Sequence, residues 1–239
     1  MSTTSSPALS TAPAPARVSG STRLVGGAAV AVAVGIVVEN AVLAAAGAPG
    51  YDAPIGEVVA YYAAQRGPVA VGTGVVALYL PLLLLLVTGL RDLVERRGGA
   101  GALWSRLAVA AGASAVAVLV LVNVLQVGLA LSADAALGPS PAAELVWRAH
   151  AAAFALALPM LGVTSVATAL AAHASGLTGS WQRGLGLAGG VLMLPAGLAT
   201  VAVADGSPLL FVGLLGLVLW LVWLVVTGVR LLRWGGRSR

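Results

Sequence analysis

Long apolar stretches alternate with short polar connectors along the chain, and this pattern predicts its secondary structure. At about 1.5 Å per residue in a helix, each stretch is long enough to cross the roughly 30 Å hydrocarbon core of a bilayer. The expected membrane-spanning helices are residues 24–46, 68–90, 107–131, 146–172, 184–204 and 208–232. The sequence therefore predicts an all-α integral membrane protein, a six-helix bundle that forms one domain of residues 23–235.

The N-terminal segment has two readings. Residues 1–22 are rich in Ser, Thr, Ala and Pro and lack an apolar period, so we expect a disordered cytoplasmic tail before the first span. The alternative is a secretory signal peptide, with Arg23 before an apolar core at 24–38 and small residues at 44–46 for cleavage. Cleavage there would remove Glu39 from the mature protein.

The first outer loop, residues 47–67, also has a helical pattern. Asp52 and Pro54 are helix start signals. The loop therefore predicts a short amphipathic helix lying on the outer membrane surface. The residues that form its apolar face are Ile55, Val58, Val59 and Tyr62.

The arginines orient the predicted helices. With both termini in the cytoplasm, eleven arginines are cytoplasmic, and Arg66 and Arg148 are outside. This bias follows the positive-inside rule. The eleven cytoplasmic positions are Arg17, Arg23, Arg91, Arg96, Arg97, Arg106, Arg183, Arg230, Arg233, Arg237 and Arg239.

Composition narrows the functional class. At 59% hydrophobic and 9% charged residues, the chain differs from soluble domains, which are roughly 25% charged. It has no cysteine, which excludes disulfides, thiolate metal sites and cysteine nucleophiles. All basic residues other than histidine are arginine, a bias typical of a GC-rich bacterium, so we expect a multi-pass protein of the bacterial plasma (inner) membrane. Membrane topology accounts for the net charge of +5, and no nucleic-acid partner is expected.

A group of polar residues at one depth is the candidate site. Because a buried charge or unsatisfied amide is costly in hydrocarbon, such groups seek one another. We therefore expect a cluster between the first, third and fourth spans, open to the outer side, in which Glu39 pairs with Arg148 or stays protonated and donates to Asn123 or Gln126. The predicted binding residues are Glu39, Asn40, Asn123, Gln126, Arg148 and His150.

The same residues also have a purely structural interpretation, as polar contacts that fix helix register or as side chains that reach the interface. No cofactor is expected. His150 and His173 lie 23 residues apart, about 34 Å along a helix, too far to ligate one haem. The spacings typical of helical metal sites are absent, and so are phosphate-binding, dinucleotide and nucleophile-elbow motifs.

One resemblance supports the topology. An acidic residue, Glu57, precedes the pair Tyr61-Tyr62 and an Arg66-Gly67 turn, and small-residue-rich spans follow. Together with residues 90–101, this resembles a family of uncharacterised six-span membrane proteins of GC-rich bacteria, a domain-of-unknown-function membrane family, over residues 24–235. The resemblance implies the six-span topology and no catalytic residue.

Three functions are compatible with these features. The first is non-enzymatic binding or passage of a small or lipidic molecule through the outer-leaflet polar cluster. The second is a membrane-embedded enzyme in which Glu39 is the catalytic acid and Asn123, Gln126 and His150 position a lipid-soluble substrate. The third is a structural or accessory subunit that contacts the lipid bilayer and another membrane protein.

Overall fold

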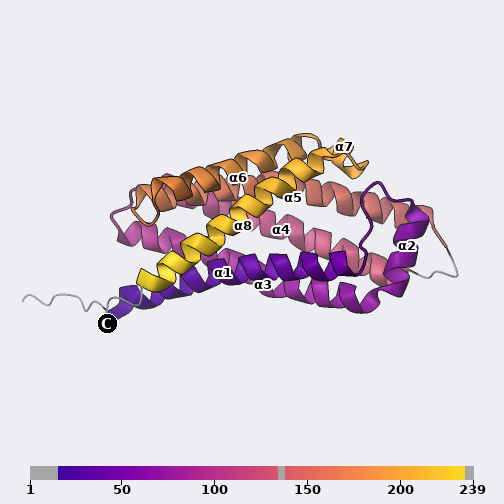
Figure 1. The fold of residues 1–239 in the computed structure, drawn as a ribbon, viewed down its shortest axis with the longest axis horizontal. Helices are drawn as coiled ribbons and strands as arrows, with labels where there is room; N and C mark the ends of the chain where they lie inside the picture. The colour runs from indigo at the N-terminus through magenta and orange to yellow at the C-terminus, as the bar shows by residue number, and fades with distance from the viewer. Residues whose placement is uncertain (1–15, 134–137, 235–239) are drawn as a thin grey trace, which may run out of the picture.

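The computed structural model describes the backbone of residues 16–133 and 138–234, and these ranges contain helices and no strand. Figure 1 shows an elongated bundle in which α2 and α7 lie at one end. The beginning of α1 and the end of α8 lie at the other end, which we call the terminal end. The helices are α1 (Ala16–Ala45), α2 (Ile55–Ala64), α3 (Arg66–Arg96), α4 (Ala102–Ser132), α5 (Pro141–Ala174), α6 (Ser180–Leu198), α7 (Thr200–Ala204) and α8 (Leu209–Trp234).

The six long helices close into a ring. Helix α1 packs against α3 and α8, α4 packs against α3 and α5, and α6 packs against α5 and α8. Each long helix therefore has two neighbours in the ring, and the first and last helices of the chain are in contact. In Figure 1, α8 crosses the bundle obliquely from α7 to the beginning of α1.

The all-α class and the polytopic character are confirmed. Of the described helices, five are long and apolar enough to cross a membrane, namely α3, α4, α5, α8 and the part of α1 from Ser21 to Ala45. Helix α6 is shorter, at 19 residues, and its first turn contains the polar residues Gln182 and Arg183. The sixth span therefore remains a prediction.

The predicted span at 184–204 is divided into α6 and α7, which corrects its assignment as one continuous helix. Pro195 lies in the last turn of α6 and has no N–H to donate to the carbonyl group of Val191. The Ala199 N–H still bonds to the Pro195 carbonyl oxygen at 3.0 Å, but Ala199 leaves the helical conformation. The proline and the loosened last turn thus end α6 within the apolar stretch.

The first helix of the chain starts earlier than the sequence predicted. Helix α1 begins at Ala16, so residues 16–22, which the sequence placed in a disordered tail, are helical; residues 1–15 lie outside the described residues. Pro15 is the last proline before α1, and helices tolerate proline only at their beginning. Because no further proline occurs in residues 16–45, a helix can start after Pro15.

The short helix expected in the first loop is α2, but its apolar face packs on protein. Val58, Val59 and Tyr62 are buried, in a cluster with Leu129 of α4 and Trp147 of α5. This apolar face therefore packs on the helix bundle, and the location of α2 on the outer surface stays a prediction. The long helices present an apolar surface at this end of the bundle, and α2 packs on that surface as a cap over the ring of helices.

Glycines permit close approach of α8 to its two neighbours. A Cβ atom on Gly26 of α1 would lie 2.8 Å from the carbonyl oxygen of Gly228, and one on Gly189 of α6 would lie 2.9 Å from that of Gly216. Any side chain at these positions would separate the backbones. Small residues at such contacts are typical of membrane helix packing.

We expect Gly26→Ala to lower the thermal stability of the detergent-purified protein, because overpacking of this kind costs about 1–3 kcal/mol. The adjacent Gly27→Ala is the matched control, since a Cβ there has no neighbour within 4 Å and Ala is the better helix former. Thermal unfolding curves of both variants measure the difference. Equal midpoints for the two would contradict the close α1–α8 contact.

Candidate functional site

A cavity of about 510 Å³ lies inside the ring of helices. Its walls come from the second halves of α1 and α4, the first half of α8, and the first halves of α3 and α5 with the turns just beyond their midpoints, so it extends from α2 to the middle of the bundle. Tyr51 in the loop before α2, and Tyr61 and Tyr62 on α2, also line it. The cap formed by α2 is therefore part of the cavity wall.

The structure brings together five of the six residues predicted for the polar cluster. They come from α1, α4 and α5, the three helices that the sequence indicated, and α3, α8 and α2 complete the wall around them. Whether they bind a ligand stays a prediction. The five cavity-lining residues are Glu39, Asn40, Asn123, Gln126 and His150.

Arg148 is the exception, and its predicted pairing with Glu39 is wrong. It is exposed and bonds to Glu144, one turn earlier on α5 with the atoms 3.3 Å apart, and to Asp205 after α7. The reason is helical geometry, because two residues turn a helix by about 200°. His150 faces the cavity, so Arg148 faces away from it.

Tyr79 of α3 is the partner of Glu39. Its hydroxyl group donates a hydrogen bond to Oε2 of Glu39 at 2.7 Å, and neither Asn123 nor Gln126 takes this place. Gly35, one turn before Glu39, makes the contact possible, because a Cβ there would lie 2.9 Å from that of Tyr79. The predicted cluster does not include Tyr79, although a phenol in the middle of an apolar span requires a hydrogen-bond partner when buried.

Two of the three amide side chains that line the cavity bond to backbone. The Asn40 amide donates to the carbonyl of Ile36 on its own helix at 2.8 Å, and the Asn123 amide donates to that of Thr73 on α3 at 3.4 Å. These bonds hold the two side chains on the wall. They leave the Asn123 side-chain oxygen unpaired.

Four buried polar atoms around the cavity have no hydrogen-bond partner in the described part of the protein. Burying such an atom without a partner is unfavourable, and native structures contain few of them. Here they come from α2, α4 and α5 and share one cavity. The four residues that carry these atoms thus meet at one place in the fold. The atoms are the Tyr61 hydroxyl, Oδ1 of Asn123, Nε1 of Trp147 and Nδ1 of His150.

Aromatic rings form the wall beside these atoms. The ring centre of Tyr51 lies 5.2 Å from that of Trp147, 5.7 Å from that of His150 and 6.1 Å from that of Phe154. The rings of Trp147 and His150 are stacked, 5.3 Å apart and inclined by 8°. Burial raises the pKa of Tyr51, which lies outside the membrane-spanning helices, so its phenol is neutral at ordinary pH. The loop residue Tyr51 thus covers the aromatic wall.

Exposed lining residues on α1 and α8 indicate an opening on the flank of the bundle. These two helices touch at Gly26 and Gly228, near the terminal end. Farther along, both helices line the cavity, with Asn40 and Ala44 on α1 and Phe211 on α8. Asn40 and Ala44 are exposed, and Phe211 is 69% exposed. The opening therefore lies on the apolar flank of the bundle.

No metal site accompanies the cavity in the described residues, where no group of three His, Cys, Asp or Glu side chains lies close enough to hold an ion. Glu39 and His150 are the titratable groups on the membrane-spanning part of the wall, together with Tyr79. The arrangement can hold a polar group by hydrogen bonds and an apolar group by contact.

We expect Tyr79→Phe to lower the free energy of unfolding by about 1–3 kcal/mol, because it removes the hydrogen-bond donor to a partly buried carboxyl group. Tyr61→Phe is the matched control, since its buried hydroxyl group has no partner and its removal should be neutral or stabilising. Thermal unfolding in detergent measures both. A Tyr79→Phe protein as stable as the wild type would show that the bond contributes little.

Comparisons with protein-family models, with curated proteins and with solved structures found no match. The structure thus shows the class of the chain without a family: it is a polytopic helical membrane protein with five candidate membrane-spanning helices among its described residues.

Proposed function

We propose that this protein binds an amphiphilic molecule in the central cavity and takes it from the bilayer through the opening between α1 and α8. The observation that carries the proposal is the division of the cavity into a polar and an apolar part. Pockets for small molecules are mostly apolar, with a few polar groups that fix orientation. This cavity has both, at the depth of the membrane.

The two parts of the cavity follow one another along the helices. Leu83 lies one turn beyond Tyr79 on α3, and Leu158 and Leu161 lie two to three turns beyond His150 on α5. Both directions lead away from α2. A bound amphiphile would place its polar head among the unpaired atoms near α2 and its apolar body toward the middle of the bundle.

The unpaired atoms restrict the chemistry of the head group. The Trp147 N–H can only donate a hydrogen bond, whereas Oδ1 of Asn123 can only accept one. A head group that satisfies both must itself accept and donate, as a hydroxyl group does. The flat rings of Trp147 and Tyr51 provide an apolar surface beside it.

The six-span topology, with both termini cytoplasmic and α2 outside, belongs to the same proposal. Helix α6 supports it because it lies in the ring between α5 and α8, like the five candidate spans. The distribution of arginines supports the orientation and a bacterial plasma membrane. Packing of α1 against α3 and α8 favours its retention over removal as a signal peptide. Membership in the six-span family suggested by residues 54–62 is likewise proposed.

The second candidate function is an enzyme in which Glu39 acts as an acid on a lipid-soluble substrate. It is favoured by the placement of Glu39, Asn123, Gln126 and His150 on one cavity wall. The binding function needs fewer assumptions, because hydrogen bonding and apolar contact suffice for it.

We expect Leu214→Trp to abolish most binding, because Leu214 lines the cavity on α8 and a larger side chain would fill it. Mass spectrometry of the compounds that co-purify with the protein in mild detergent measures the effect, with at least about fivefold less compound per protein expected. The neighbouring Leu215→Trp is the control, since Leu215 is 55% exposed on the outer side of α8. Absence of any co-purified compound, or equal loss in both variants, would contradict the proposal.

Glu39→Gln distinguishes the candidate functions while it preserves the shape of the side chain and its ability to accept a bond from Tyr79. A binding protein should yield the same compound as the wild type in a smaller amount. An enzyme should yield a chemically different compound, the unreacted substrate. If Glu39 has only a structural role, neither the identity nor the amount of the compound should change. Glu57→Gln is the control, since Glu57 is exposed on α2 and does not line the cavity.

A further inference from the structure

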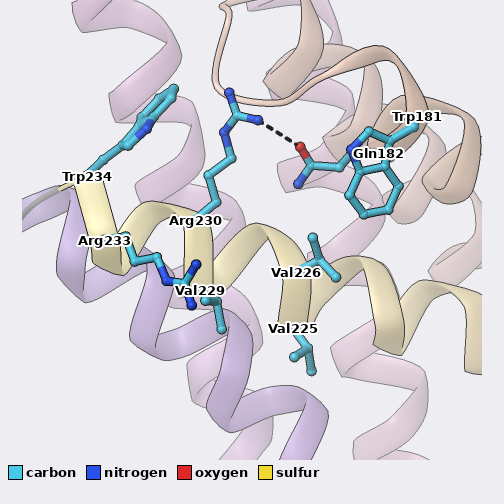
Figure 2. Close-up of a pocket in the computed structure, with 8 residues that line it drawn as sticks. All are labelled: Trp181, Gln182, Val225, Val226, Val229, Arg230, Arg233 and Trp234. Carbon is cyan, nitrogen blue, oxygen red and sulfur yellow. Dashed lines mark hydrogen bonds between the residues drawn. The ribbon is translucent and has the colours of Figure 1, made fainter.

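A second hollow, of about 380 Å³, lies near the terminal end of the bundle between α6 and α8. It shares no residue with the central cavity. Figure 2 shows its lining, with arginine and tryptophan side chains near the end of α8 and valines farther along the same helix. The lining residues are Trp181, Gln182, Val225, Val226, Val229, Arg230, Arg233 and Trp234.

A buried glutamine holds one of the two arginines in place. Gln182 is 1% exposed, and its side-chain oxygen accepts bonds from the Gly179 N–H at 3.0 Å and from Nη1 of Arg230 at 3.2 Å (Figure 2). Its side-chain nitrogen lies 3.5 Å from the Thr227 hydroxyl group. The Arg230 guanidinium group is thus positioned by the fold, whereas its Nε atom is buried without a hydrogen-bond partner.

Positive charge gathers here without a matching carboxylate. The guanidinium carbons of Arg230 and Arg97 lie 4.7 and 5.1 Å from the ring centre of Trp234. In the described part of the chain, neither of them nor Arg233 forms an ion pair. The acidic residues at the end of α3 are paired with Arg91 and Arg96 on their own helix. Two cations beside one ring, with an unpaired Nε atom, favour an anion as the missing partner.

The valines show which kind of anion fits. Val226 and Val229 each lie four residues before an arginine, so they occupy the same face of α8 one turn deeper. Val225 beside them is 39% exposed and Trp181 across the hollow is 61% exposed. A soluble anion would leave this apolar wall uncovered, whereas an acyl chain would cover it.

We propose that this hollow binds an anionic phospholipid, with its phosphate group at Arg230 and Arg233 and an acyl chain along Val226 and Val229. Arginine binds phosphate oxygens through several N–H groups at once, and tryptophan is typical of the headgroup region. Topology accounts for arginines at the ends of membrane helices. It does not account for a guanidinium group fixed by a buried glutamine above an apolar groove.

Native mass spectrometry of the full chain in a neutral detergent tests the proposal with phosphatidylglycerol and phosphatidylcholine of equal acyl chains. We expect phosphatidylglycerol to bind roughly tenfold more tightly, and Arg230→Gln/Arg233→Gln to remove this preference. Arg233→Gln alone should weaken it severalfold; Arg233 is exposed and makes no hydrogen bond within the described structure, so this variant keeps the test valid if the double variant does not fold.

The matched control is Arg91→Gln/Arg96→Gln, which removes two positive charges from the same end of the bundle and should leave phosphatidylglycerol binding within about twofold of the wild type. Equal affinity for the two lipids would overturn the proposal, and so would an equal loss in the control variant. Displacement of phosphatidylglycerol by inorganic phosphate would identify a site for soluble anions and would overturn it as well.

Discussion

Polar groups within a bilayer have no water to bond with, and the arrangement of this bundle follows from that constraint. Glu39 would be costly on a helix surface that faces lipid. The hydrogen bond from Tyr79 ties it to α3, and Gly35 makes room for the tyrosine ring. The same constraint turns Asn123 and His150 toward the interior, so part of the cavity wall inside the ring of helices is polar.

Close packing at one end of the bundle produces space at the other. Glycines bring α1 and α8 into backbone contact near the terminal end, at Gly26 and Gly228. Away from that end α8 diverges from α1 toward α7 (Figure 1), both helices line the central cavity, and α2 covers its end. A helix pair that touches at one point and diverges from it gives a cavity with a lateral opening, a geometry suited to a ligand that arrives through the membrane.

The two hollows differ in chemistry because they lie at different depths. The central cavity has one carboxyl group, an aromatic wall and no arginine. The hollow between α6 and α8 lies beside arginines and tryptophans at the end of the helices. Charged groups are stable near the headgroups, where long side chains reach water and phosphate, whereas only paired or neutral groups persist deeper. The lining of each hollow thus suits its place along the helices.

The sequence by itself determined the helical class and where the long apolar helices lie along the chain, because both depend on the local pattern of residues. The tertiary structure decided which way the side chains face. Rotation of a helix about its axis is weakly specified when most of its faces are apolar. Arg148 and His150 are only two residues apart, yet Arg148 bonds to Asp205 outside the cavity and His150 lies within it. The pairing of Glu39 with Tyr79 likewise joins residues 40 positions apart, and only the packing of α1 on α3 brings them together.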